Sequence, residues 1–587
     1  MVRFLPGVVA VIVTLAALAG GAHAGEGETP WPAAVEGFQA PAPGEHPRLF
    51  FREGDLDRLK ARARTPEGKA ILRRLRQCLN GGDGRSMPSV KNPMTSAYGK
   101  QGGPKPQDSE LPVGAYSLSH AAGFGFLYHL TGEKRYADLG RECFEWAFDG
   151  VRDRDREARY SFRQPGGALR AGPSLGWYAV GYDLCYDGWD EAYRKKVAGA
   201  IQNYDEGQHC SLAELARGAR HMPASNHWGM QVGGAALALL AIRDDPGVDM
   251  AKIEPLLEQS RKAMIRNMTE GFGDGGWFPE GDGTGSMSSQ IAFVPALQAW
   301  RTAGGLDYIS PRPNAPWMTL KWIFLTVPRR GKMDFPSRGA YPHNVWDRDG
   351  ISGAGYFCEG FGGVWDVHRP ALLWFYNHHL KAPDEKNGTP LDTPSPYPHH
   401  AILSLVNWPF GMKEKNPAEC LPRATGDAKY GFYMFRNRWQ DEKDIVISVQ
   451  TYSTRGWHKA NSSGAVEVWG LGKKMRWGNL RNGLTYFRPA ADGSASMVSG
   501  DGTAMAIDFS GASGAPAMLV MTGRGMPRGE TVDAGGTAFA LKFLTEDKTP
   551  EPRVEDGKVV VVDQTVTLED GHIVLSKMAG PWEGATR

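Results

Sequence analysis

Two polar residues, Asn226 and His227, open an apolar stretch with helical spacing, PASNHWGMQVGGAALALLAI at 223–242. Ser225 suits a helix N-cap, so free backbone N–H groups and the positive end of the helix dipole favour an anion there. Gln231 lies four positions after His227 and shares its helix face. The stretch therefore predicts a polar site at a helix N-terminus, with a capping Asn and a core His as the alternative.

A glycine-rich loop, GFGDGGWFPEGDGTGSMSSQ at 271–290, holds three acids: Asp274, Glu280 and Asp282. So much glycine costs backbone entropy, and close approach to a ligand is one explanation. The phosphate-binding loop pattern fails because no Gly-Lys-Ser/Thr follows. A carboxylate pair for glycoside hydrolysis, calcium ligation and plain turn chemistry all remain open.

A third polar stretch, MDFPSRGAYPHNVWDRDG at 333–350, places Arg338, Tyr341 and His343 within six positions. Arginine can hold a carboxylate with two hydrogen bonds, and tyrosine and histidine can move protons. An ordinary surface loop is the alternative to this chemical role.

Aromatic residues accompany these stretches. Trp228 and Trp277 lie beside the polar candidates and offer faces for a sugar ring, although a tryptophan is more often part of a core. Trp457 and His458, in RGWHKAN at 455–461, come just before a strand, where a loop can lean over another domain. A lone histidine such as His458 is more often structural.

No His or Cys pattern in the sequence indicates a metal site, and no cofactor motif is present. The pairs His378-His379 and His399-His400 lack the spacing of a zinc site, and we expect both on the surface. Six scattered cysteines form no CxxC pair, which favours buried free thiols over a disulfide framework. We therefore predict no cofactor and no metal ligands, and no structural metal ion is indicated.

The N-terminus predicts export. An apolar run from Leu5 to Leu18 follows Arg3, and Ala22-His23-Ala24 has small residues where a signal peptidase cuts. The run is too short for the ~20 apolar residues of a spanning helix. We expect residues 1–24 to be a signal peptide and the mature chain to be secreted or periplasmic, without a membrane anchor.

Composition narrows the class of protein. The 587 residues carry 67 Lys+Arg against 65 Asp+Glu, a formal charge of +2, so a nucleic-acid partner is not expected. Glycine (75) and tryptophan (18) are abundant, and the 41% hydrophobic fraction suffices for a core. The length predicts two to four domains.

Helical spacing dominates from about residue 47 to 379 and has no fixed repeat period. The expected helices, joined by short Gly, Pro and Asp connections, are 52–79 (one or a pair), 117–131, 134–148, 172–186, 191–204, 227–242, 250–268, 286–302 and 370–380. So many antiparallel helices with short loops can bury their apolar faces in an (α/α) toroid of helical hairpins. We assign this toroid to residues 25–390.

After about residue 401 the apolar residues alternate. Expected strands are 430–437, 444–452, 464–469, 504–509, 517–522, 538–544, 559–562 and 572–576, with Gly, Asp and Pro turns between them. Strands without intervening helices predict a sandwich or barrel. We assign an antiparallel β-sandwich to residues 391–587, after a proline-rich linker at 387–400.

Five segments together resemble the heparinase II/III-like and alginate lyase superfamily of polysaccharide lyases. They are HPRLFF at 46–51, YDLCYDGWDEAYRKKV at 182–197, SNHWGMQVGGAALAL at 225–239, GWFPEGDG at 276–283 and HKANSSGAVEVWGLGKKMRWG at 458–478. Their order covers most of the chain after residue 24. The resemblance implies an N-terminal toroid and a C-terminal sandwich, the same division that the periodicity gives.

The resemblance also implies roles for residues. Asn226 and His227 match the Asn-His pair that binds and neutralises a uronate carboxylate, Glu280 matches the glutamate of the EG motif, and His458 matches the histidine that opens the first sandwich motif. Many members have a tyrosine soon after that glutamate, whereas this chain has none before the next helix; Tyr341 is the candidate to replace it. Lys, Ala and Asn follow His458, so the structural zinc of some members does not carry over.

The implied reaction is β-elimination on a uronic-acid polymer such as alginate or glucuronan. The C5 proton is only weakly acidic while the carboxylate is charged, so Asn226, Arg338 and a protonated Glu280 would hold and neutralise that group. His227 or Tyr341 would then take the proton.

Protonation of the departing O4 oxygen falls to Tyr341 or His343. The alternatives are a glycoside hydrolase that uses Glu280 with Asp282 or Asp274, a uronate C5-epimerase, and a non-catalytic glycan-binding protein. The expected partner is an acidic polysaccharide or oligosaccharide, and the sequence predicts no oligomeric state.

Overall fold

A computed structural model describes the helical part of the chain most fully. The described residues are 31–88, 117–150, 160–281, 291–310, 312, 314–329, 332–334, 356–382, 385 and 397–422, followed by short segments and strands between 424 and 577. Six of the residues singled out above lie outside this set: Asp282, Arg338, Tyr341, His343, Trp457 and His458. The predicted signal peptide lies outside it too.

The helical part comprises these helices among the described residues: α2 (Leu56–Arg64), α3 (Pro66–Asn80), α4 (His120–Thr131), α5 (Lys134–Phe148), α6 (Ala168–Cys185), α7 (Glu191–Gln202), α8 (Leu212–Ala216), α9 (Asn226–Ile242), α10 (Met250–Arg266), α12 (Phe293–Ala299), α13 (Asn314–Leu325), α14 (Tyr356–Gly363), α15 (Arg369–Phe375) and α17 (Pro398–Asn407). Two short pairs accompany them, β1 (Ala33–Ala34) with β2 (Leu306–Asp307) and β3 (Val327–Arg329) with β4 (Lys332–Asp334). The sequence predicted most of the long helices within a few residues of these bounds.

Local signals explain where α3 begins and ends. The Thr65 hydroxyl accepts a hydrogen bond from the Gly68 N–H, and Pro66 occupies the first turn, where its missing N–H costs nothing. Gly81 ends the helix with φ 76°, a conformation that glycine adopts without strain.

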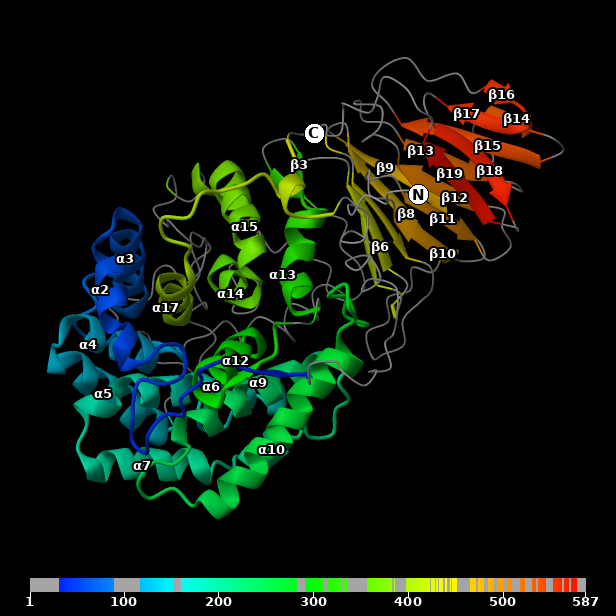
Figure 1. The fold of residues 1–587 in the computed structure, drawn as a ribbon. Coiled ribbons are helices and arrows are strands. Elements are labelled where there is room, and N and C mark those ends of the chain that lie inside the picture. Colours follow the sequence, from blue (N-terminus) through cyan, green and yellow to red (C-terminus); the bar gives the residue numbers. More distant parts are fainter. Residues whose placement is uncertain are drawn as a thin grey trace, which may run out of the picture.

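Helices α6 and α9 form the centre of the helical part. Both are almost entirely buried, and they pack together more closely than ordinary side chains allow. A Cβ atom on Gly234 would lie 1.8 Å from the Gly172 carbonyl oxygen, so only glycine fits there. In Figure 1 the other helices surround this pair.

The last described helix of this part returns to the first ones. Helix α17 packs against α3 and α4, and α14 packs against both α12 and α17. This contact between distant segments is consistent with the predicted toroid. It also carries the helical packing past residue 390, where the proline-rich segment predicted the domain boundary.

Antiparallel strands follow. They are β5 (Ala424–Asp427), β6 (Phe432–Arg436), β7 (Val446–Gln450), β8 (Ala465–Gly470), β9 (Lys473–Asn479), β10 (Leu484–Pro489), β11 (Ala495–Ser499), β12 (Ala504–Asp508), β13 (Met518–Thr522), β14 (Glu530–Ala534), β15 (Thr537–Leu544), β16 (Arg553–Glu555), β17 (Lys558–Val561), β18 (Gln564–Glu569) and β19 (His572–Lys577). They pair in the orders β5-β6-β7-β8-β9, β10-β11-β12-β13-β15-β14 and β16-β17-β18-β19. The packing of these sheets as a sandwich stays a prediction.

Strands β5 and β6 meet the helical part through the glycine-rich loop. The buried Asp427 carboxylate accepts hydrogen bonds from the backbone N–H groups of Gly275 and Trp277, at 3.2 and 3.4 Å. The Trp277 ring stacks on Phe432 with the ring centroids 3.6 Å apart. Behind them the Arg436 guanidinium donates to carbonyl oxygens at the end of α13.

A buried polar cluster fixes the segment before α2. The His46 ring lies between Asp183 of α6 and Asp245 after α9, with Nδ1 2.7 Å from Asp183 Oδ1 and Nε2 3.1 Å from Asp245 Oδ2. Arg48 and Tyr182 also donate to the Asp245 carboxylate, each at 2.7 Å. Two of the segments that carry the family resemblance, 46–51 and 182–197, are thus joined by hydrogen bonds that position α6 and α9.

Two expectations about His and Cys residues have different outcomes. The prediction that His399 and His400 lie on the surface is wrong, because both are fully buried and the His399 ring stacks on Trp177. Burial lowers the pKa of His399 to about 3, so its ring is neutral at ordinary pH. Free thiols are confirmed at Cys143, Cys185, Cys210 and Cys420. Among the described helices, none has the length and apolar content of a membrane span.

Candidate functional site

The N-terminus of α9 has the cap that the sequence predicts. The Ser225 hydroxyl accepts a hydrogen bond from the His227 N–H at 3.4 Å, and Ser225 itself has extended backbone angles, φ −97° and ψ 139°. Asn226 is buried in the first turn, whereas His227 is half-buried. The first turn therefore presents the His227 imidazole, while the backbone N–H groups of Asn226, His227 and Trp228 are hydrogen-bonded within the protein.

Glu280 reaches this helix end from the glycine-rich loop. Its side chain is 1% exposed, and its Oε2 atom accepts a hydrogen bond from the Asn226 backbone N–H at 3.1 Å. The helix dipole favours a negative group at this position. The Glu280 carboxyl group thus occupies the start of α9, and three predicted site residues from two segments come together.

His221 is a neighbour that the sequence reasoning missed. Its ring stacks on that of His227, with the centroids 4.2 Å apart and an angle of 22° between the planes. Burial, and then the charge of His209, lower the pKa of His221, which favours its neutral form beside His227. The available signal was the motif HMPASNH, in which both rings flank the capping turn.

Gln231 lies one turn further along α9 and is fully buried. Its backbone presses against α6, where a Cβ on Gly172 would lie 2.7 Å from the Gln231 Cα atom. Among the described residues, neither its Oε1 nor its Nε2 atom has a hydrogen-bond partner. A buried amide without partners costs about 1–3 kcal/mol, so Gln231 retains capacity for a further hydrogen bond.

The two tryptophans proposed as sugar platforms are part of the core. Trp228 is 2% exposed and donates its indole N–H to the Ala263 carbonyl oxygen at 3.0 Å. Trp277 is 3% exposed, with one face against Phe432 and the Lys321 ammonium 5.1 Å from its ring centroid. Stacking on a sugar would require this packing to open, and that role stays a prediction for both residues.

The acids of the glycine-rich loop differ in their surroundings. The Asp274 side chain is 64% exposed and forms an ion pair with Arg312 at 3.2 Å, whereas Glu280 is enclosed at the start of α9. The hydrolase alternative pairs Glu280 with Asp282 or Asp274. Asp282 lies outside the described residues, so this alternative stays a prediction.

The remaining predicted site residues, Arg338, Tyr341, His343, Trp457 and His458, lie outside the described residues. In the part of the chain that is described, no group of three His, Cys, Asp or Glu side chains has a geometry that could hold a metal ion. Among the described residues, the candidate site therefore consists of four groups at the N-terminus of α9. They are the half-buried imidazole of His227, the buried carboxyl group of Glu280, and the buried amides of Asn226 and Gln231.

Comparison with known proteins gives structural likenesses alone. No family model matches the chain, and no curated protein matches it. Similar solved structures include the heparan sulfate lyase HepC from Pedobacter heparinus, with a TM-score of 0.39, 11% identity, and coverage of 78% of this chain and 81% of that chain. A heparinase III gene product with methylated lysines gives a TM-score of 0.37 and 13% identity over 70% of this chain and 66% of that chain.

Another heparinase III structure gives a TM-score of 0.33 and 10% identity, with coverage of 77% of this chain and 67% of that chain. These neighbours are a heparan sulfate lyase and heparinases. Since their TM-scores are below 0.5, the likenesses assign no function to this chain.

Proposed function

We propose that this protein is a polysaccharide lyase that cleaves a uronic-acid-containing glycan by β-elimination. The observation that carries the proposal is the meeting of Asn226, His227 and Glu280 at the start of α9, through the 3.1 Å hydrogen bond from the Asn226 N–H to the Glu280 carboxylate. These residues come from two segments whose types match the family's Asn-His pair and EG glutamate.

In this proposal the half-buried imidazole of His227 takes the C5 proton of the uronate. Its stacking on the neutral ring of His221 holds the imidazole plane in place. Removal of a C5 proton needs a positioned base, and a neutral histidine side chain can act as one near neutral pH. Tyr341 is the alternative base that we propose.

Neutralisation of the uronate carboxylate is assigned to the Asn226 side-chain amide, with Arg338 as the charged partner. Glu280 would contribute directly only when protonated, because an ionised Glu280 would repel the substrate carboxylate. Tyr341 or His343 would protonate the departing O4 oxygen. Export after cleavage of residues 1–24 would bring the enzyme to extracellular or periplasmic glycans.

The reaction type can be tested with a panel of polymers that includes alginate, glucuronan and heparan sulfate. Each is incubated with the purified protein, and two products are followed: new reducing ends, and the near-ultraviolet absorbance of an unsaturated uronate. We expect both to rise together on at least one acidic polymer. New reducing ends without the absorbance would reject the lyase and favour hydrolysis, and the absence of both products would reject the proposal for these substrates.

A further inference from the structure

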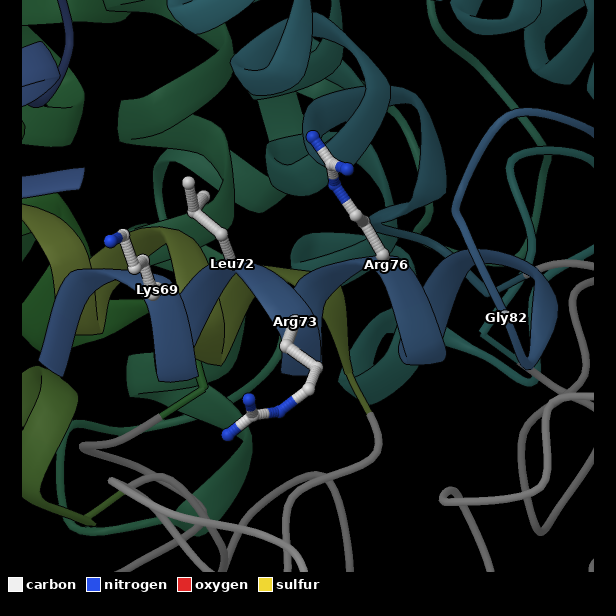
Figure 2. Close-up of a pocket in the computed structure, with 5 residues that line it drawn as sticks. All are labelled: Lys69, Leu72, Arg73, Arg76 and Gly82. Atoms are coloured by element: carbon white, nitrogen blue, oxygen red, sulfur yellow. The ribbon is translucent and has the colours of Figure 1, made fainter. Parts of the chain in front are cut away.

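A second concave site lies on α3, formed by residues that the proposed reaction does not use. The cavity has a volume of about 340 Å³ and is lined by Lys69, Leu72, Arg73, Arg76 and Gly82. This volume is at the lower end of the range of small-molecule sites, about 300–1,000 Å³. Figure 2 shows the four side chains projecting from α3, with Gly82 in the turn that follows the helix.

The lining residues occupy one face of the helix. Positions 69, 72, 73 and 76 have the spacing i, i+3, i+4 and i+7, which places them together along about two turns. Lys69 and Arg73 are exposed, and Leu72 and Arg76 are half-buried. The cations at the two ends, Lys69 and Arg76, are therefore separated by about 10 Å along the helix axis.

The three cations of the cavity, Lys69, Arg73 and Arg76, lack acidic partners among the described residues. No carboxylate is among the residues that line the cavity, and no described carboxylate forms an ion pair with Lys69, Arg73 or Arg76. The Arg76 Nε atom is buried and has no hydrogen-bond partner among the described residues. Elsewhere on the helical surface comparable cations are paired, as Lys196 is with Glu145 and Arg261 with Glu258. The cavity therefore combines positive charge with unused donors.

The wall at the end of α3 is built by a folded turn. The Asn80 side-chain oxygen accepts hydrogen bonds from the N–H groups of Gly82 and Gly84, at 2.9 and 2.8 Å. A Cβ on Gly84 would lie 2.9 Å from the Arg76 Cγ atom, so this turn packs directly on the arginine stem. The turn limits the directions that Arg76 can take, and the shape of the cavity does not depend on one long flexible side chain.

We propose that this cavity binds an acidic oligosaccharide through two or more of its carboxylate or sulfate groups, at a site separate from the start of α9. Arginine and lysine donors suit such oxyanions, and a span of two helical turns suits a ligand with several charges. The aliphatic side chain of Leu72 provides a small apolar surface for a sugar ring. The choice of a glycan as the ligand rests on the proposed function.

Other polyanions fit the cavity less well. None of the lining residues is aromatic, whereas single-stranded nucleic acid is bound by base stacking on aromatic side chains. A membrane surface would favour a flat basic region with exposed large apolar residues, and this site is concave with Leu72 half-buried.

The test measures binding by isothermal titration of the purified protein with three hexasaccharides: one sulfated and heparan-type, one of glucuronic acid, and neutral maltohexaose. The pocket variant is Lys69→Gln/Arg73→Gln, which changes two exposed side chains that have no ion pair with any described carboxylate. The control variant is Lys252→Gln/Lys262→Gln on α10, which removes the same charge from another exposed surface. Circular dichroism establishes that all three proteins have the same helix content.

We expect an acidic hexasaccharide to bind the wild type and the control alike, and the dissociation constant of the pocket variant to rise roughly tenfold or more. Higher salt should weaken the wild-type binding, since exposed charges are screened. Equal affinities in the pocket and control variants would overturn the inference. So would binding of maltohexaose equal to that of the acidic sugars, or binding of single-stranded DNA or anionic vesicles in place of the sugars.

The outcome separates this inference from the proposed reaction. Near-ultraviolet absorbance is followed in parallel samples, so turnover and binding are measured independently. Pocket-dependent binding without an unsaturated product would keep the second site and reject the lyase. An unsaturated product with equal binding in the pocket and control variants would support the lyase and reject the second binding site.

Discussion

The position of Glu280 changes how the start of α9 can act on an anion. A carboxylate that accepts the Asn226 N–H already satisfies a donor which a substrate anion would otherwise use. The hydrogen bond instead fixes the glycine-rich loop against the first turn of the helix. Glu280 is therefore a positioning residue, which holds the glycine-rich loop at the N-terminus of α9.

Substitution of Glu280 tests this role. Glu280→Gln keeps an oxygen acceptor for the Asn226 N–H, so we expect the melting temperature to change little. Glu280→Ala leaves that buried N–H without an acceptor and should cost about 1–3 kcal/mol of stability. Thermal unfolding followed by circular dichroism measures both. Equal destabilisation by the two variants would show that charge, and not the hydrogen bond, is what matters.

The sequence could predict the cap and the Asn-His pair because those signals are local. It could not predict that Glu280 bonds to Asn226, since the two lie 54 positions apart and the contact depends on the folded loop. It also could not predict that Trp277 is covered by Phe432, a residue in a different part of the fold.

At the scale of elements, glycines set the distance between the two central helices. Gly234 of α9 touches the backbone of α6, and this contact holds Gln231 and the first turn of α9 in position. Gly199 of the surface helix α7 is in open space. A Cβ atom added to Gly199 would have no neighbouring atom within 4 Å.

These two glycines form a matched pair of substitutions. Gly234→Ala should destabilise the protein by more than about 2 kcal/mol, because the new methyl group meets the Gly172 carbonyl oxygen. Gly199→Ala should be neutral or should stabilise by about 0.5–1 kcal/mol, since it removes backbone freedom from the unfolded chain. The two melting temperatures provide the comparison, and similar values would contradict the packing described for α6 and α9.

The buried cluster around His46 provides the second prediction at this scale. Burial alone would raise the pKa of Asp245, but the hydrogen bond and charge of His46, the charge of Arg48 and the Tyr182 hydroxyl hold it below its usual range. His46→Ala leaves Asp183 and Asp245 short of a partner and should cost about 3–5 kcal/mol.

A matched control is His209→Ala, which removes a histidine from a partly exposed ion pair with Glu214 and should change stability by less than about 1 kcal/mol. Thermal unfolding measures both variants. If His46→Ala and His209→Ala had the same melting temperature, the buried cluster around His46 would not be what stabilises the segment before α2.

Amphipathic helices such as α5 could be predicted from the sequence because their apolar residues repeat on one face. Helix α13 was missed for the opposite reason: all of its residues are buried, so the polar half of the pattern is absent. Arg436 and Trp439, which follow the helical part in sequence, donate hydrogen bonds to carbonyl oxygens of α13 that water would otherwise reach.

At the scale of the whole molecule, Asp427 connects the strands with the glycine-rich loop. Burial raises the pKa of this carboxyl from its ordinary value of 3.8 to about 6, although hydrogen bonds from Tyr430 and Trp277 oppose the shift. Between these two values the folded protein holds a proton that the unfolded chain releases. The free energy of unfolding therefore falls as pH rises through this window, by roughly 3 kcal/mol in total.

Melting curves of the wild type and of Asp427→Asn between pH 3.5 and about 7 test this dependence. We expect the wild type to lose stability relative to the variant as the pH rises from about 4 to about 6, with a constant difference above that range. Asp366→Asn, which removes an exposed carboxylate from the helical part, should follow the wild type. Parallel curves for the wild type and Asp427→Asn would contradict the assignment.

The central claim is that the imidazole at the start of α9 removes a proton from a uronate. The most direct measurement is the rate of unsaturated-product formation on the best acidic polymer by the wild type, His227→Ala and His378→Ala, a control that removes an exposed histidine paired with Glu414. The account predicts a loss of about 10²–10⁴-fold for His227→Ala and an unchanged rate for His378→Ala. A wild-type rate in His227→Ala would contradict it.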